Sequence, residues 1–311
     1  MTRYEGLAAG TILAGFGLIV FGGVVRVSGS GMGCGPNWPI CNGQVVPTFS
    51  LATAIEYTHR LLAALVTVLT VGLVLFDRRE RRADRALFWL PVLALGLVLV
   101  QAGLGAVAVL NALDPWVIAA HLGMAEAYLG CVLVLGVTLV ARRRSPAERS
   151  DGLGAFAPAA AAAVYLVTLT GAYTAASGAA LACGWPLCGT HLIPTGWTPV
   201  DVQMTHRWLA LLALLAVFAL ALHARRGRDV PSWLTRTTAA LAVTIVVQAL
   251  IGAANIWLNL APWVAEIHLT VAVLIWSGLV VVTTADRARG TVPGEEPAPA
   301  QRPLAGAASR H

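Results

Sequence analysis

Long apolar stretches recur along the whole chain, separated by shorter segments that are polar or rich in glycine and proline. A helix needs about 20 residues to cross a bilayer, and eight stretches are long enough or nearly so. The pattern therefore predicts an all-α polytopic membrane protein with eight transmembrane helices. We place them at residues 6–27, 53–75, 87–109, 116–140, 155–176, 202–223, 233–254 and 264–284.

The composition excludes an ordinary soluble domain, because 58% of the residues are hydrophobic, only 12% are charged and the mean hydropathy is +0.75. All 21 basic residues are arginine, and they cluster in every second connection. Those clusters are Arg78, Arg79, Arg81, Arg82 and Arg85, then Arg142, Arg143, Arg144 and Arg149, then Arg225, Arg226 and Arg228. The connections without arginine are 28–52, 110–115, 177–200 and 255–263.

Because positive charge near helix ends stays cytoplasmic, this distribution places both termini in the cytoplasm and the arginine-free connections outside. The net charge of +6 is then explained by the arginines that fix the orientation of the chain in the membrane. We expect the lipid bilayer as a partner of this multi-pass cell membrane protein, and no nucleic acid.

The two halves of the chain resemble each other at a shift of 147 residues. The matched pairs are Ser30/Ser177, Gly31/Gly178, Trp38/Trp185, Pro39/Pro186, Cys41/Cys188, Pro47/Pro194, Gln101/Gln248, Gly105/Gly252, Pro115/Pro262, Trp116/Trp263 and Val117/Val264. Four spans per unit is an even number, so both units enter the membrane in the same direction. This predicts two tandem four-helix bundles in a parallel pseudo-two-fold repeat.

The repeat also predicts where the units end. An N-terminal bundle covers residues 1–140, a cytoplasmic linker covers 141–154 and a C-terminal bundle covers 155–286. The Pro-, Ala- and Gly-rich segment 287–311 is expected to be a disordered cytoplasmic tail.

Four histidines form two copies of one pair. His59 and His121 are 62 residues apart, and so are His206 and His268, at the same shift of 147. Ionisable side chains inside a membrane usually face the bundle interior and mark function. Two histidines per bundle suit axial ligation of one haem iron, whereas zinc normally takes more protein ligands.

The carboxylate at Glu56 breaks the symmetry. It precedes His59 by three residues and so projects on the same helix face, whereas the matching residue is Gln203. Glu56 is therefore our candidate catalytic group, with a structural hydrogen bond or an ion pair to Arg60 as the alternative. Glu126 lies on a different face from His121 and is a weaker candidate.

Three arginines on the outer side are candidate contacts for haem propionates, which a guanidinium fork suits. Arg60 and Arg207 each follow a histidine, and snorkelling to lipid headgroups is the alternative for both. At the repeat shift Arg26 aligns with Tyr173, so it has no basic counterpart in the second half. We therefore expect it to serve an anion in the first bundle only.

The outer connections contain two cysteine pairs. Pairs close in sequence and facing an oxidising exterior favour disulfides, here Cys34–Cys41 and Cys183–Cys188. Free thiols or redox-active cysteines that handle electrons are the alternatives. Cys131 falls within a span and is expected to be a small buried hydrophobic residue.

These motifs together resemble the haem A synthase family, in its variant with cysteine pairs in the outer loops. The resemblance covers about residues 6–285 and rests on the spacing of several motifs. They are Arg26-Val-Ser-Gly-Ser-Gly-Met-Gly-Cys34, Trp38-Pro39-Ile40-Cys41, Glu56-Tyr-Thr-His59-Arg60 and Pro115-Trp116 before His121, with their partners in the second half.

The resemblance implies a membrane oxidoreductase that oxidises the C8 methyl of haem O to a formyl group, giving haem A for cytochrome oxidase assembly. His59 and His121 would bind the substrate haem beside Glu56, and His206 and His268 would bind the iron of a resident haem B. Both haem sites would lie toward the outer face. The implied partners are haem O synthase, the cytochrome oxidase assembly process and an electron carrier that the sequence does not identify.

Two other functions use the same histidines. A di-haem cytochrome b would only carry electrons from a quinol to an outer partner, and it needs neither Glu56 nor an exchangeable porphyrin. A haem transporter or chaperone would release haem unmodified.

Overall fold

The computed structural model of the chain describes residues 2–76, 85–141, 152–190, 192–227 and 230–290. Within these residues, eight α-helices are long and apolar enough to cross a membrane, as predicted. They are α1 Arg3–Val27, α2 Leu51–Leu75, α4 Arg85–Leu110, α5 Pro115–Ala141, α6 Phe156–Ala176, α7 Pro199–Arg226, α8 Ser232–Trp257 and α9 Pro262–Gly290. A short 3-10 helix, η1 Ala179–Leu181, lies in the connection after α6 and was not predicted.

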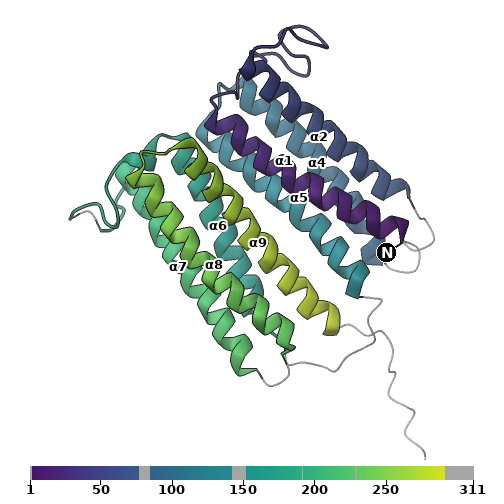
Figure 1. Cartoon of the computed structure of the whole chain (residues 1–311), viewed down its shortest axis with the longest axis vertical. Coiled ribbons are helices and arrows are strands. Elements are labelled where there is room, and N and C mark those ends of the chain that lie inside the picture. Colours follow the sequence, from purple (N-terminus) through teal and green to yellow (C-terminus); the bar gives the residue numbers. More distant parts are fainter. Residues whose placement is uncertain (1, 77–84, 142–151, 191, 228–229, 291–311) are drawn as a thin grey trace, which may run out of the picture.

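The helices form two groups of four that lie side by side (Figure 1). In the first group α1 contacts α2, α2 contacts α4, α4 contacts α5 and α5 contacts α1; α6, α7, α8 and α9 form the second group in the same way. The groups meet where α5 contacts α6 and α9 and where α1 contacts α9. A parallel two-fold relation between these halves stays a prediction, as do the domain boundaries at 140 and 155.

Two long connections, 28–50 and 177–198, project from the same end of the helices, which we call the loop end (Figure 1). The N-terminus lies at the opposite end. The helices α2, α5, α7 and α9 all begin at the loop end. Consequently, a residue early in any of these four helices lies near the two long connections.

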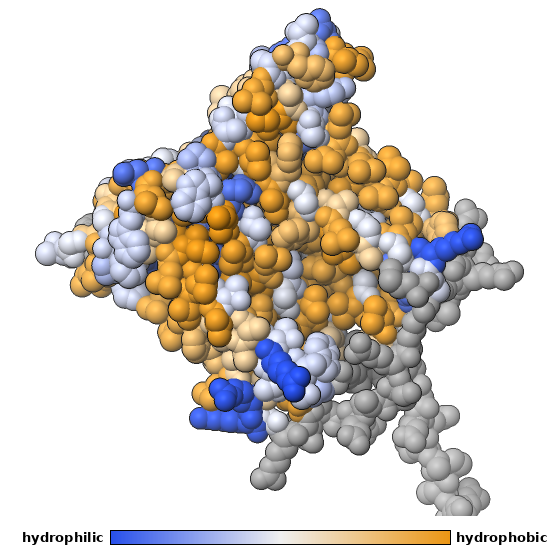
Figure 2. Space-filling view, in the orientation of Figure 1, coloured by the Kyte–Doolittle hydropathy of each residue, from blue (hydrophilic) through white to orange (hydrophobic). Residues whose placement is uncertain are grey.

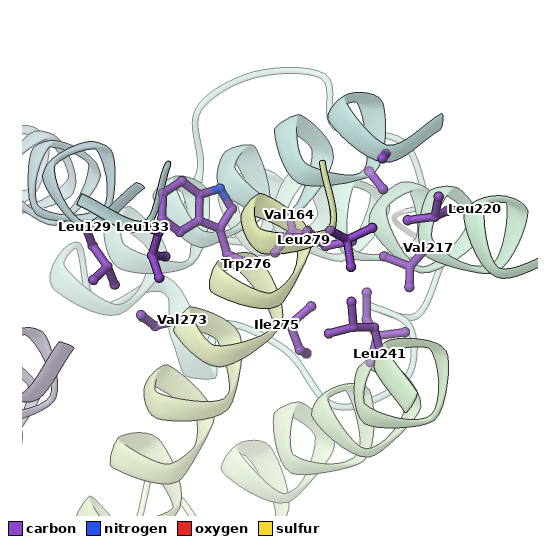
Figure 3. Packing of buried hydrophobic residues seen from close by; sticks show 14 of the residues in the cluster. Leu129, Leu133, Val164, Val217, Leu220, Leu241, Val273, Ile275, Trp276 and Leu279 are labelled. Atoms are coloured by element: carbon purple, nitrogen blue, oxygen red, sulfur yellow. The ribbon is translucent and has the colours of Figure 1, made fainter. Parts of the chain in front are cut away.

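One hydrophobic cluster joins the two halves. It includes Leu129 and Leu133 of α5, Val217 of α7 and Ile275 of α9; Figure 3 shows Ile275 between the leucines of α5 on one side and Val217 on the other. Trp276 of α9 packs onto α5, where a β-carbon at Gly130 would lie 2.7 Å from the indole ring. The interior is therefore continuous across the boundary between the halves.

The outward faces of the helices are apolar. Figure 2 shows hydrophobic side chains over most of the visible face, with hydrophilic residues toward its rim. Leu13, Val68 and Val243 are each more than 60% exposed although they lie within long helices. Such a surface is unfavourable in water and suits contact with lipid.

The tail prediction needs one correction. Helix α9 continues through Gly290, so residues 287–290, assigned to a disordered tail, are helical. The remaining tail, 291–311, lies outside the described residues, as do most of the linker 141–154 and the arginines at 78–82, 142–144, 149 and 228.

The repeat register also needs a correction in the first helix of each half. Helices α1 and α6 end at the C-cap residues Ser28 and Ser177. Each is followed by a left-handed glycine, Gly29 with φ +66° and Gly178 with φ +74°. These pairs are 149 residues apart, so the match of Ser177 with Ser30 was wrong. At this register the counterpart of Arg26 is Ala175 instead of Tyr173.

Candidate functional site

All four paired histidines lie near the loop end. They follow the first residues of α2, α5, α7 and α9 by only six to eight positions. At a rise of 1.5 Å per residue this places them about 9–12 Å into the helices. The sequence prediction of two sites on the same side of the membrane agrees with this placement.

Within each half the structure brings the two histidines together. His59 of α2 and His121 of α5 lie at similar depth from the loop end, and so do His206 of α7 and His268 of α9. The helices that carry each pair occupy diagonal corners of their group, since α2 contacts α1 and α4, while α5 also contacts both. The imidazoles therefore approach each other across the interior of the group.

Each of the four rings lies against a glycine of the preceding helix. A β-carbon at Gly22 or Gly105 would lie 3.2 Å from Cε1 of His59 or His121, respectively. In the second half, a β-carbon at Gly171 would lie 2.9 Å from Cε1 of His206, and one at Gly252 would lie 3.1 Å from Cε1 of His268. The absence of side chains at these positions lets each imidazole sit directly on a neighbouring backbone.

The donor set fits haem. Buried Nδ1 atoms of His59, His121 and His268 have no hydrogen-bond partner in the described residues, so these rings are not held as ordinary core histidines. The described residues contain no cluster of three or more His, Cys, Asp or Glu that could hold a metal ion. Two imidazoles suffice for a haem iron, because the porphyrin supplies four further ligands.

Polar groups beside the histidines differ between the halves. Gln101 Nε2 lies 3.2 Å from Nε2 of His121, whereas the equivalent Gln248 donates to the backbone oxygen of His268 at 2.9 Å. From the sequence, this glutamine pair was assigned only to the repeat. The sequence feature that could have indicated its role is its position, 20 residues before each histidine.

Glu56 is buried and both of its carboxylate oxygens are bonded. Oε2 accepts a hydrogen bond from the backbone N–H of Cys34 at 2.7 Å, and Oε1 pairs with Arg60 at 2.6 Å. Arg60 also donates to the backbone oxygens of Asn37 and Pro39 at 3.1 and 3.3 Å. The ion pair with Arg60, which was the alternative to a catalytic role for Glu56, is thus present in the structure. Glu56 and Arg60 together hold the first outer loop by these bonds.

The second half builds the same frame with a neutral residue. Gln203 Oε1 accepts from the backbone N–H of Cys183 at 3.0 Å, as Glu56 does from Cys34. Arg207 donates to the backbone oxygens of Gly184 and Pro186 at 2.8 and 3.0 Å. The Gln203 Nε2 atom then donates to Ala180, so within the described residues Arg207 has no carboxylate partner.

Both predicted disulfides are present. Cys34 and Cys41 are bonded in the first outer loop, and Cys183 and Cys188 in the third. The sulfur of Cys131 is free and buried, also as predicted. Because Cys34 and Cys183 donate their backbone N–H groups to Glu56 and Gln203, each disulfide adjoins the polar frame of its half.

Arg26 lies in the last turn of α1, and α1 contacts both α5 of its own half and α9 of the second half. One turn before Arg26, a β-carbon at Gly23 would overlap the carboxylate of Glu266 on α9. Arg26 therefore lies near the boundary between the halves, and the expectation that it serves an anion in the first bundle only stays a prediction.

Comparison with known proteins identifies the family. The chain matches the family described as cytochrome oxidase assembly protein over residues 5–54 and 48–280, which includes all four histidines and both disulfides. The chain belongs to this family.

Among curated proteins similar to the chain, a haem A synthase of Symbiobacterium thermophilum is 36% identical over 217 residues, covering 67% of this chain and 71% of its own length. A haem A synthase of Alkalihalophilus pseudofirmus is 30% identical over 285 residues, covering 88% and 95%. One from Geobacillus kaustophilus is 32% identical over 273 residues, covering 84% of each chain. The similarity thus extends over 71% to 95% of the length of these relatives.

Proposed function

We propose that this protein is a haem A synthase of the cell membrane, which oxidises the C8 methyl group of haem O to a formyl group. Membership of the family and the similarity to curated haem A synthases support this activity. The product haem A serves the assembly of cytochrome oxidase. Oxidation of a methyl to a formyl proceeds through two hydroxylations, each removing two electrons, after which the gem-diol loses water.

The two halves divide this work. His59 and His121 bind the iron of the substrate haem O, and His206 and His268 bind the iron of a resident haem B. A resident haem supplies one-electron redox chemistry. The observation that supports the division is the replacement of the Glu56 carboxylate by the Gln203 amide in an otherwise matching frame.

Glu56 acts on the reacting methyl group. Its carboxylate is fixed by the Cys34 N–H and by Arg60, so its negative charge needs no reorganisation during the reaction. Preorganised charge of this kind stabilises charge that develops in a transition state. We assign Glu56 the stabilisation of positive charge at the methyl carbon, where a carbocation captured by water is one route.

The haem sites face the outer side of the membrane. This orientation is supported by the arginine distribution, which assigns the N-terminus to the cytoplasm, and by the position of the histidines at the opposite, loop end. The C-terminus follows an even number of spans and is also cytoplasmic. Haem O synthase would supply the substrate, and the haem that His206 and His268 would hold would supply one-electron chemistry toward an electron carrier.

Haem extraction tests the proposal. The protein is co-expressed with a source of haem O, and the extracted pigments are separated and identified. Wild type should yield haem A together with haem B, and Glu56→Ala should accumulate haem O. Haem B alone would indicate an electron-transfer cytochrome, and release of unmodified haem would indicate a transporter; either result rejects the synthase.

A further inference from the structure

The hydrogen bonds of the paired imidazoles differ between the two halves. A histidine binds a metal through the lone pair of one ring nitrogen, and a hydrogen bond from the other ring nitrogen normally fixes its tautomer and orientation. One histidine of each pair differs from its counterpart at the first of these nitrogens, and the other histidine differs at the second. The two halves therefore present unequal ligands to an iron.

Gln101 of α4 caps His121 in the first half. Its Nε2 lies 3.2 Å from Nε2 of the imidazole. An amide nitrogen only donates, so the ring nitrogen must accept this hydrogen bond with its lone pair. Nδ1 of the same ring is buried and has no hydrogen-bond partner in the described residues, so it offers a porphyrin no alternative. An iron that binds His121 must therefore displace Gln101.

Gln248 of α8 leaves the corresponding ring free. It lies four residues before the glycine that contacts the ring, as Gln101 does. Its Nε2, however, donates to the backbone oxygen of His268 at 2.9 Å instead of to the imidazole. Among the residues that the structure describes, no hydrogen bond reaches Nε2 of His268. An iron binds this nitrogen without displacing a side chain.

Thr170 of α6 orients the other histidine of the second half. Its Oγ1 lies 3.3 Å from Nδ1 of His206, and the same hydroxyl donates its hydrogen to the backbone oxygen of Val167 at 3.1 Å. A hydroxyl that has given its only hydrogen can only accept, so Nδ1 of His206 is the donor. This bond fixes the tautomer that carries its lone pair on Nε2, the form that binds iron.

Phe21 of α1 gives His59 no such bond in the first half. It is the counterpart of Thr170 at the corrected register of 149 residues. Its ring stacks near that of His59, with the centroids 6.4 Å apart, and it carries no atom that accepts a hydrogen bond. Nδ1 of His59 is buried without a partner in the described residues. Both departures from the repeat therefore favour iron binding in the second half over the first.

We propose that Gln101 is a displaceable cap that favours release of haem from the first pair, whereas Thr170 is a positioning residue that favours retention of haem at the second. When haem leaves, Gln101 regains its hydrogen bond to His121, which stabilises the open pair relative to the filled one. A synthase needs this difference, because its product must leave while the resident haem stays. This inference rests on the proposed function, since it requires haem at both histidine pairs.

Haem retention at equilibrium tests the inference. The purified protein is incubated with haem O and then with graded concentrations of apomyoglobin, which captures released haem. Extraction of the retained pigment counts haem O with haem A for the first pair and haem B for the second. The variants His121→Ala and His206→Ala, which each lose one of these signals, confirm the assignment.

Gln101→Leu should bind haem at the first pair about fivefold more tightly, because the open state loses the net contribution of one hydrogen bond. A damaged fold would weaken binding, so tightening is not explained by structural harm. Thr170→Val should bind haem at the second pair about tenfold more weakly, as is typical when the partner of a ligating histidine is removed. Gln101→Met is a further apolar variant should Gln101→Leu fail to fold.

Matched variants separate the hydrogen bonds from side-chain polarity. Gln101→Asn keeps the amide but is one methylene shorter, so it should tighten the first pair as Gln101→Leu does. Gln248→Leu removes an amide that is bonded to a backbone oxygen, and it should not tighten the second pair. Thr168→Val removes a hydroxyl that donates within α6, to Val164, and it should leave both pairs unchanged.

The inference is overturned when Gln101→Leu and Gln101→Asn fold but bind haem O no more tightly than wild type, or when Gln248→Leu tightens the second pair equally. Wild-type retention of haem B by Thr170→Val would remove the positioning role. Failure of the proposed function looks different, since wild type would then form no haem A, whatever its retention of haem O.

Discussion

Glu56 and Cys34 are joined directly, since the side-chain carboxylate of Glu56 accepts a hydrogen bond from the backbone N–H of Cys34 at 2.7 Å. The same cysteine forms the disulfide of the first outer loop. The candidate catalytic carboxylate is thus held by the loop that covers it. Changes in the loop and changes in the carboxylate should therefore affect the same step.

Replacing Glu56 by Gln should abolish most of the activity without emptying the site. The amide oxygen can still accept from Cys34, as Gln203 does from Cys183, but the negative charge is lost. Loss of one preorganised electrostatic contact typically costs about 100- to 1,000-fold in rate. Haem A formation per bound haem, measured by pigment extraction, checks this; a rate within threefold of wild type would remove Glu56 from the chemistry.

Opening the first disulfide should harm activity more than opening the third-loop disulfide. The variants are Cys34→Ser with Cys41→Ser, and the matched control Cys183→Ser with Cys188→Ser. Each loses roughly 2–4 kcal/mol of constraint on unfolding, but only the first displaces a carboxylate next to substrate. The two double variants should therefore lose similar thermal stability, whereas the first should lose much more of its haem A yield. Equal losses of haem A would contradict the role given to the Glu56–Cys34 bond.

A side chain at Gly105 should weaken haem binding in the first half. A β-carbon there lies 3.2 Å from the His121 ring, and the γ-methyl groups of valine would add to the overlap. Overpacking of this kind costs about 1–3 kcal/mol. Gly103→Val is the control, because nothing lies within 4 Å of a β-carbon at Gly103 on the same helix.

Haem content of the two glycine variants, determined from the absorption spectrum per mole of protein, measures the effect. Gly105→Val should lose haem from the first pair, and Gly103→Val should retain it. Equal occupancy in both variants would mean that the glycine contact does not position His121.

Glu126 should be dispensable for folding. Its side chain is fully buried in α5, and neither carboxylate oxygen has a hydrogen-bond partner among the described residues. Burying an unsatisfied polar group typically costs about 1–3 kcal/mol. Glu126→Leu should therefore raise the melting temperature in detergent while haem A formation persists; a folded variant that makes no haem A would place Glu126 in the reaction instead.

The spans were predictable because membrane crossing demands long apolar runs whatever the tertiary contacts. The register of the first repeat helix was not. Residues 28–31 read Ser-Gly-Ser-Gly, so two alignments with Ser177 and Gly178 match equally well in sequence. Only the backbone decides, since the C-cap serine and the left-handed glycine are Ser28 and Gly29.

Site residues that recur in both halves could be predicted from the sequence, whereas contacts between segments distant in the sequence could not. The histidine pairs followed from their spacing. The bonds of Arg60 to the loop carbonyls depend on how residues 37–40 fold back over α2. The contact of Glu266 with the α1 backbone at Gly23 depends on how the two helix groups pack. Neither leaves a periodic signal in the sequence.

The shared hydrophobic cluster has a consequence for catalysis. Because Trp276 of α9 is seated on Gly130 of α5, the halves cannot move apart without exposing their common interior. We therefore expect the spacing between the two histidine pairs to stay constant. If both pairs hold haem as proposed, electron transfer between them would need no hinge motion, and only entry of haem O and departure of haem A would require the protein to open.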